Sequence, residues 1–318
     1  MIVTKEMLDK ELQAQYSQFR FIISMNSKRS GLKIMNSLVR LTKGQKVKGA
    51  VNETHFVSSS ITQDHKIRTR IFRPQGTTKT LPAMIYFHGG GYMMGIPEMA
   101  NVFYADILKR RDVVIVAPDY RLSPKDPFPA GFNDCFDVLL WMRDNAEELK
   151  IDPDNFIIAG HSAGGGMAAA ITLKVRDTQA IKPAFQMPIY PMLDHRMMTE
   201  SSKMQGSAMW DANINARAWN LYLRNIDQQI PPYASPALNQ DYHDFPPTIS
   251  FVGDLEPFYD ENKAYMEALE KASVPVKFKV FNGGYHGFEV GSPKATIAKE
   301  ANKFQLDAFE EFYDKYIQ

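Results

Sequence analysis

Short apolar runs alternate with longer helical segments along most of this chain of 318 residues, and this alternation constrains the fold more than any other feature. Runs of four to six residues that are mostly continuous in apolar character are typical of strands buried on both faces of a sheet. They occupy residues 83–87, 113–117, 156–159, 185–190, 248–252 and 276–281. Residues 55–57 and 66–72 show the alternating pattern of an antiparallel pair. The sequence therefore predicts a mostly parallel, doubly wound α/β sheet, with its ligand site at the carboxyl ends of the strands.

Composition is that of an ordinary globular protein, with 44% hydrophobic and 23% charged residues and a net charge of +1, which gives no sign of a nucleic-acid partner. The single cysteine, Cys135, has no partner for an intrachain disulfide, so a reducing compartment is permitted. No signal peptide is apparent, and no apolar run is long enough to span a bilayer. We therefore expect a cytoplasmic protein without a membrane span, folded as one domain over residues 1–318.

Two segments lie outside the alternation. Residues 1–50 look helical, with Gly31 and Gly44 as the expected breaks, and carry ten Lys/Arg against three Asp/Glu. Such a basic segment can bind an anionic surface. Lys and Arg between apolar positions, however, more often form the solvent-exposed face of amphipathic helices, and we favour this second interpretation. Residues 195–228 are apolar at helical spacing and contain no strand pattern. We expect these two segments to form a helical cap over the carboxyl edge of the sheet.

Ser162 lies between an apolar run and an Ala-rich helical segment, in the order Gly160-His161-Ser162-Ala163-Gly164. A serine at the tip of a sharp strand-to-helix turn is a nucleophile elbow, in which strand and helix approach so closely that only glycine fits on either side. The alternative is a tight turn with a solvent-facing serine. Distant segments must distinguish the two.

A second glycine-rich loop follows the run that ends at residue 87, with the sequence His-Gly-Gly-Gly-Tyr over residues 88–92. A flexible turn is one interpretation and a phosphate loop another, although no Lys and Ser/Thr follow in the Walker spacing. The placement instead matches the oxyanion loop that accompanies a nucleophile elbow. We expect the N–H groups of Gly89, Gly90 and Ala163 to be the oxyanion donors.

His286 is the candidate base, because it follows the last predicted strand through a flexible Asn-Gly-Gly loop. His88 and His161 more plausibly brace their loops. The acid is open on the residues alone, since four carboxylates follow the run that ends at residue 252. They are Asp254, Glu256, Asp260 and Glu261.

Four motifs together resemble the hormone-sensitive-lipase family of α/β-hydrolase carboxylesterases, of the bacterial family IV type. They cover residues 88–92, residues 119–124 with 127–130, residues 160–165 and residues 285–288. The resemblance runs from about residue 66 onward and is weakest in residues 1–50 and 195–228, where that family has its cap. It implies the α/β-hydrolase fold, a Ser-acid-His triad, no metal or organic cofactor, and a plausible homodimer.

That family usually places its acid first in Asp-Pro-Leu-x-Asp-Glu, where this chain has Glu-Pro-Phe-Tyr-Asp-Glu over residues 256–261. The resemblance therefore implies that Glu256 is the acid, with Asp254 as runner-up. Asp260 is expected to brace the loop or cap the next helix.

These residues predict hydrolysis of short- to medium-chain carboxylic esters, with Ser162 as nucleophile, His286 as base and Glu256 as acid. An amidase or peptidase would use the same triad. A non-catalytic small-molecule receptor on the same fold could dispense with the base, so the presence of His286 and the full glycine loop argues against that class.

Overall fold

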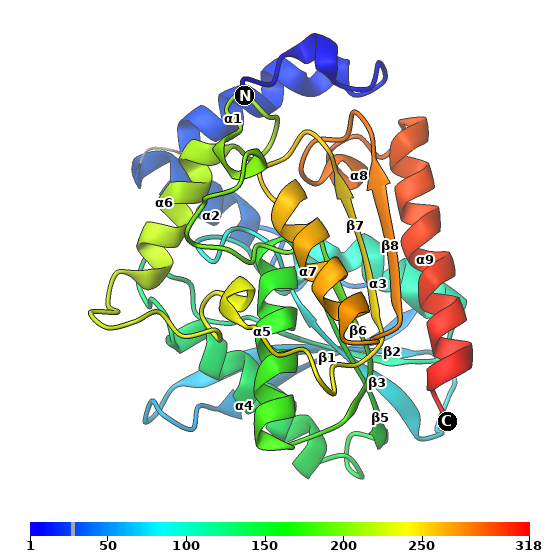
Figure 1. Cartoon of the computed structure of the whole chain (residues 1–318). Coiled ribbons are helices and arrows are strands. Elements are labelled where there is room, and N and C mark those ends of the chain that lie inside the picture. Colours follow the sequence, from blue (N-terminus) through cyan, green and yellow to red (C-terminus); the bar gives the residue numbers. More distant parts are fainter. Residues whose placement is uncertain (27–28) are drawn as a thin grey trace.

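One mixed sheet forms the centre of the molecule in the computed structural model, which describes residues 1–26 and 29–318 (Figure 1). In these residues, eight strands pair in the order β1-β2-β4-β3-β5-β6-β7-β8. They are β1 (Ala50–Ser58), β2 (Lys66–Pro74), β3 (Leu81–Phe87), β4 (Val114–Pro118), β5 (Ile151–His161), β6 (Pro183–Ile189), β7 (Thr248–Gly253) and β8 (Val276–Phe281). β2 pairs antiparallel with β1 and β4, and the other neighbours are parallel. The predicted α/β fold is confirmed.

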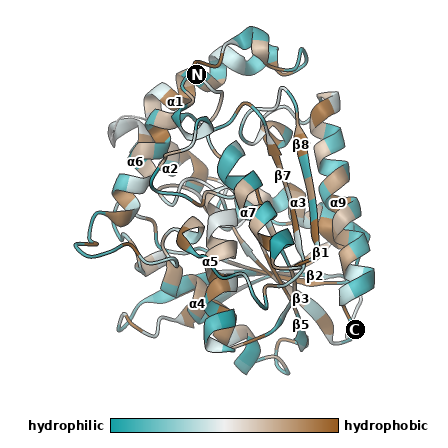
Figure 2. Ribbon diagram, viewed as in Figure 1, coloured by the Kyte–Doolittle hydropathy of each residue, from teal (hydrophilic) through white to brown (hydrophobic). Residues whose placement is uncertain are grey.

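Helices cover both faces of the sheet, as Figure 1 shows. Successive side chains of a strand point to opposite faces, so Ile85 packs with the core under α4 and α5, whereas Met84 packs with the core under α3 and α9. In Figure 2 the strands are largely brown and the surrounding helices carry both colours. These helices are α3 (Asn101–Arg110), α4 (Ala130–Asp144), α5 (Ala163–Thr178), α7 (Tyr259–Lys271), α8 (Phe288–Gly291) and α9 (Thr296–Tyr316).

The N-terminal segment begins with two short 3₁₀ turns, followed by α1 (Tyr16–Asn26) and α2 (Arg29–Arg40). The break expected at Gly31 is wrong, because Gly31 lies inside α2. A Cβ at this position would come within 2.0 Å of the Met25 carbonyl oxygen, so the glycine serves close packing between α2 and the end of α1. Gly44, with a φ of +83°, does lie in the turn after α2.

The interval between β6 and β7 contains α6 (Ala212–Leu223) and no strand, as expected. It packs against the N-terminal segment, where Arg20 pairs with Asp211 at 2.6 Å and the Tyr16 hydroxyl donates to the Gly206 carbonyl at 2.9 Å. Figure 1 shows α1, α2 and α6 side by side. Of the helices in residues 1–26 and 29–318, none is both long and apolar enough to cross a membrane.

Candidate active site

Ser162 lies between β5 and α5 in a backbone conformation that residues other than glycine rarely adopt, with φ 60° and ψ −123°. The two flanking glycines leave no room for a side chain. A Cβ on Gly160 would lie 2.2 Å from the Gly164 carbonyl oxygen, and one on Gly164 would lie 2.0 Å from that of Phe87. The local sequence thus forms the sharp, strained turn that the glycine spacing predicts.

The structure brings Ser162, His286 and Glu256 together, although they lie in three separate loops. His286 Nε2 is 2.7 Å from Ser162 Oγ, and His286 Nδ1 hydrogen-bonds to Glu256 Oε2. Because an ionised carboxylate only accepts, Nδ1 carries the proton and Nε2 accepts from the serine hydroxyl. All three are buried, with Ser162 8%, His286 6% and Glu256 0% exposed. This order of contacts allows the imidazole to take the serine proton.

Glu256 reaches His286 by folding its side chain back over the turn that follows β7. Its other oxygen, Oε1, accepts the N–H of Gly253 at 3.1 Å. Both carboxylate oxygens are therefore occupied, which fixes the orientation of the group.

The neighbouring carboxylates point elsewhere. Asp254 accepts the N–H of Gly283 at 2.7 Å, and burial raises the pKa of its carboxyl. Asp260 accepts the N–H of Ser201 at 2.8 Å, so it ties α7 to the interval between β6 and β7. Glu261 accepts the N–H of Leu193 at 2.7 Å. In the part of the chain that the structure describes, Glu256 is the only one of the four hydrogen-bonded to His286.

The glycine loop after β3 lies against Ser162. A Cβ on Gly89 would come 3.4 Å from the Ser162 Cβ, so the loop backbone and the serine are neighbours. Among the described residues, no acceptor is paired with the N–H groups of Gly89, Gly90 or Ala163. Unpaired donors at a helix N-terminus and in a glycine loop suit a developing negative charge.

Two histidines of the motifs brace these loops. The His88 ring stacks on Tyr120 with centroids 4.2 Å apart, and the Tyr120 hydroxyl donates to the His88 carbonyl at 2.6 Å. His161 contacts the Tyr86 hydroxyl at 2.9 Å and the Gln305 amide oxygen at 3.1 Å. Burial lowers the pKa of His161 to about 4, so it stays neutral at physiological pH.

Aromatic rings enclose His286, and the sequence does not indicate that Tyr190 and Phe258 are two of them. Phe258 and Tyr190 meet the imidazole edge-on, each with centroids 4.9 Å apart. The Tyr190 hydroxyl donates to Glu289, a buried carboxyl three residues beyond His286. Burial raises the pKa of Glu289 to about 7. An acidic residue within an otherwise apolar stretch after the histidine was the only sequence signal for this second carboxyl.

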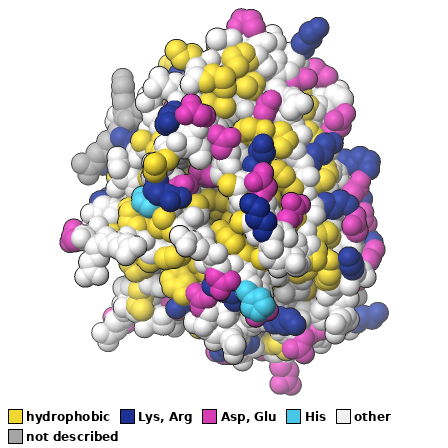
Figure 3. Space-filling model, viewed as in Figure 1, with side chains coloured by type: hydrophobic (Ala, Val, Ile, Leu, Met, Phe, Trp, Pro, Cys, Tyr) yellow, Lys and Arg dark blue, Asp and Glu magenta, His cyan; other side chains and the backbone are white. Residues whose placement is uncertain are grey.

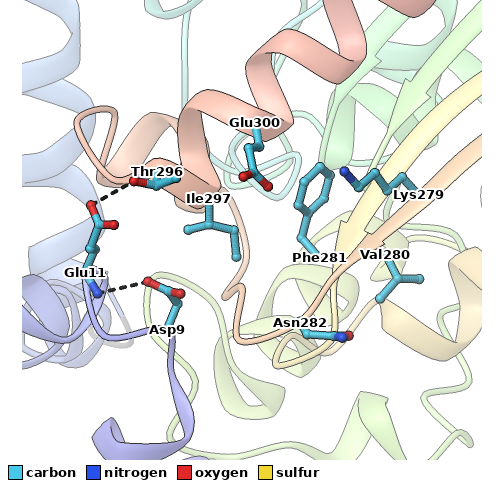
Figure 4. Close-up of a pocket in the computed structure, with 9 residues that line it drawn as sticks. All are labelled: Asp9, Glu11, Lys279, Val280, Phe281, Asn282, Thr296, Ile297 and Glu300. Carbon is cyan, nitrogen blue, oxygen red and sulfur yellow. Dashed lines mark hydrogen bonds between the residues drawn. The ribbon is translucent and has the colours of Figure 1, made fainter.

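The N-terminal segment reaches the loop that carries His286. The Asp9 N–H donates to the Gly283 carbonyl at 3.1 Å, and Glu11 accepts the first N–H of α9, that of Thr296, at 3.1 Å. Figure 4 shows both acids at the rim of an open pocket of about 400 Å³, between this segment, β8 and α9. None of the predicted site residues lines this pocket. The contact between Asp9 and Gly283 at its rim anchors the loop that carries His286.

Comparisons with known proteins show the family and the fold of this chain. Residues 84–290 match a family model described as the alpha/beta hydrolase fold. An arylesterase of Saccharolobus solfataricus is 30% identical over 252 residues, which are 78% of this chain and 81% of that protein. An ethyl acetate hydrolase of Pseudomonas putida is 28% identical over 249 residues, or 76% and 78% of the two chains. The solved structure of a bacterial heroin esterase superposes with a TM-score of 0.87 at 27% identity, covering 98% of this chain and 99% of that one.

Proposed function

Because the chain belongs to the α/β-hydrolase family, in the group of esterases related to hormone-sensitive lipase, we propose that it hydrolyses carboxylic esters through an acyl-enzyme at Ser162. The observation that carries the proposal is the buried sequence of contacts from the serine hydroxyl through His286 to Glu256. Relatives named for ester hydrolysis support the reaction class.

The first half-reaction transfers the acyl group to the enzyme. Ser162 Oγ attacks the ester carbonyl carbon while its proton passes to Nε2 of His286. Glu256 holds the Nδ1 proton and stabilises the imidazolium that forms. The tetrahedral intermediate then collapses, the carbon–oxygen bond to the alcohol breaks, and Nε2 returns the proton to the departing oxygen.

The second half-reaction regenerates the serine. Water attacks the acyl carbon and gives a proton to Nε2, and the bond to Ser162 Oγ breaks as that oxygen regains the proton. In both halves the N–H groups of Gly89, Gly90 and Ala163 stabilise the oxyanion. One such donor contributes about 10²–10³ in rate.

Residues 1–50 and 195–228 serve as the cap in this proposal, within a single domain over residues 1–318. Their contacts with each other and with the glycine loop support this assignment: Asn36 in α2 donates to the Met93 carbonyl at 3.1 Å. A cap that packs this closely favours small-molecule esters of short to medium acyl chain. We also propose a cytoplasmic location, and size-exclusion chromatography tests the homodimer that the family resemblance makes plausible.

Replacement of the nucleophile tests the reaction. Ser162→Ala should lower kcat for a p-nitrophenyl acyl ester by about 10⁴-fold or more, because the remaining groups cannot form the acyl-enzyme. Ser24→Ala, on exposed α1, is the matched control and should retain activity. Wild-type turnover by a folded Ser162→Ala variant would contradict the mechanism.

A substrate panel separates the neighbouring functions. An acyl-length series should show its optimum at short or medium chains, and anilides of the same acids should react far more slowly. Faster turnover of anilides would reassign the protein to amidases. Stoichiometric binding of esters without a burst of alcohol would indicate a receptor.

A further inference from the structure

A long stretch of the N-terminal segment lacks carboxylates altogether. Residues 12–52 contain eight Lys/Arg and no Asp/Glu, whereas the whole chain has a net charge of only +1. The rest of the chain therefore carries +1 − 8 = −7. Six of these eight residues belong to α2 or to the turn over residues 41–48.

Helix α2 has two apolar stripes, and only one of them faces the protein. Leu32 is buried, and Met35 and Val39 pack against the same core. Ile34 and Leu38 on another side of α2, followed by Leu41 in the turn directly after it, recur at i, i+4 and i+7 and are 50%, 52% and 79% exposed. On the adjoining α1, Phe21 is 64% exposed. Residues 1–50 are expected to form amphipathic helices with Lys and Arg on the solvent face, but in the structure Phe21, Ile34 and Leu38 are exposed to solvent as well.

Cations lie along one side of this exposed stripe and in the turn that follows it. Lys33, Arg40, Lys43, Lys46 and Lys48 are all exposed, and no salt bridge of the described residues includes them. The surface over α7 and α9 differs, because Figure 3 shows Lys/Arg and Asp/Glu side chains intermixed there. In α9, for example, Lys303 pairs with Asp307. The cations beside α2 are therefore available to bind an anionic partner from outside the chain.

We propose that α2 and the turn over residues 41–48, together the basic face, dock on the surface of an anionic lipid bilayer. Ile34, Leu38 and Leu41 enter the boundary between headgroups and acyl chains, and the flanking cations contact lipid phosphates. An amphipathic helix with Lys and Arg beside an aliphatic stripe has the chemistry for this arrangement. Neither feature suffices alone for a helix of this length.

Two other occupants fit the basic face less well. A symmetric dimer through the basic face would place the same cations of two copies opposite each other, which is repulsive. A nucleic acid would satisfy the cations but would leave the aliphatic side chains in water. An anionic bilayer satisfies both kinds of group.

Docking would bring the bilayer to the side of the proposed cap, because the opposite side of α2 touches the glycine loop through Asn36, Met93 and Gly95. If the proposed esterase function holds, lipid-dissolved esters would enter from that side. The docking itself does not depend on catalysis, so Ser162→Ala should bind vesicles as the wild type does.

Vesicle co-sedimentation tests the proposal. The full chain should sediment with vesicles of equal parts phosphatidylglycerol and phosphatidylcholine at 50 mM NaCl, and much less with pure phosphatidylcholine or at 500 mM NaCl. Lys43→Glu/Lys46→Glu/Lys48→Glu should weaken binding about 100-fold or more. Leu38→Ser/Leu41→Ser should weaken it about 10-fold or more, since two aliphatic insertions are lost.

Matched variants elsewhere on the surface control for net charge and hydropathy. Lys79→Glu/Lys125→Glu/Lys294→Glu makes the same change in charge at exposed sites, and Ile61→Ser/Val102→Ser removes two aliphatic side chains that are 58% and 77% exposed. Both should bind as the wild type does, and circular dichroism melting checks that every variant is folded.

Three results would overturn the proposal. One is absence of wild-type binding to anionic vesicles at low salt, and another is equal loss of binding in the control variants. The third is a dimer, seen by sedimentation velocity without lipid, that Leu38→Ser/Leu41→Ser dissociates, since a second copy would then cover the stripe. If the wild type fails to bind vesicles but binds RNA in a salt-sensitive way, and Leu38→Ser/Leu41→Ser binds the same RNA equally well, the partner of the basic face would be a nucleic acid.

Discussion

The catalytic edge and the proposed cap follow different structural rules. At the catalytic edge, formed by the loops after β3, β5, β7 and β8, backbone presses on backbone: a Cβ on Gly164 would lie 2.0 Å from a carbonyl oxygen. In the N-terminal part of the cap, Gly31 is packed as closely against the end of α1, but Gly44 has nothing within 4 Å of the same position, and aliphatic side chains face outward. Close approach of neighbouring backbone segments determines the conformation of the edge. The arrangement of the cap depends on contacts with segments that are distant in the sequence.

The carboxylates after β7 give the largest expected difference between the two regions, because Glu256 belongs to the edge and Asp260 holds the cap. Glu256→Gln should lower kcat by about 10⁴-fold, since the amide can no longer orient and stabilise the protonated His286. Asp260→Asn should lower it less than about 10-fold, because Asp260 acts only through Ser201. Steady-state kinetics on one p-nitrophenyl ester compares them, with Asp254→Asn as a further control. A collapse of kcat in Asp254→Asn alone would transfer the role of acid.

Two glycine substitutions compare packing directly. Gly164→Ala should reduce the free energy of unfolding by about 4 kcal/mol or more, or prevent folding, because its Cβ meets the backbone of Phe87 and His88. Gly44→Ala should cost about 1 kcal/mol, which is the strain of a positive φ in open space. Urea denaturation measures both. Equal losses would show that the backbone around Gly164 is no more tightly packed than the backbone around Gly44.

Glu289 tests how strongly the edge depends on burial. A carboxyl whose pKa rises from 4.5 to about 7 on folding is held neutral, so its ionisation destabilises the folded chain as pH rises through that window. Glu289→Gln should therefore have nearly the wild-type free energy of unfolding below pH 4.5. Above pH 7 it should exceed the wild type by about 3 kcal/mol. Urea denaturation from pH 4 to pH 8 checks the sign, and a difference that shrinks with rising pH would contradict it.

Much of the edge is predictable from sequence because each part obeys a short-range rule. The glycines around Ser162 indicate the turn, and the runs before residues 88 and 254 indicate the strands that carry the loops. Rules of this kind act within a few residues, so they can be read from the order of the residues. The acid is different: the residues alone leave four carboxylates open, and only the family resemblance, through the register of Pro257 and the Asp-Glu pair, implies Glu256.

The cap and the surroundings of His286 are less predictable, because long-range packing decides them. Gly31 suggests a helix break by propensity, yet it lies inside α2 because the end of α1 passes close by. Helical periodicity in α2 does not reveal which of its two apolar stripes faces the protein. Nor does the sequence indicate that Tyr190, nearly a hundred residues upstream, meets Glu289.

The hydrogen bond from Asp9 to Gly283 has a consequence for synthesis of the protein. The two residues are 283 − 9 = 274 positions apart, so the ribosome must translate the whole sheet between them. While β1 to β8 are being translated, Asp9 cannot form its hydrogen bond with Gly283. The loop that carries His286 can acquire its anchor only in the last stage of translation, and a ribosome-bound chain that stops before residue 283 has an elbow but no base.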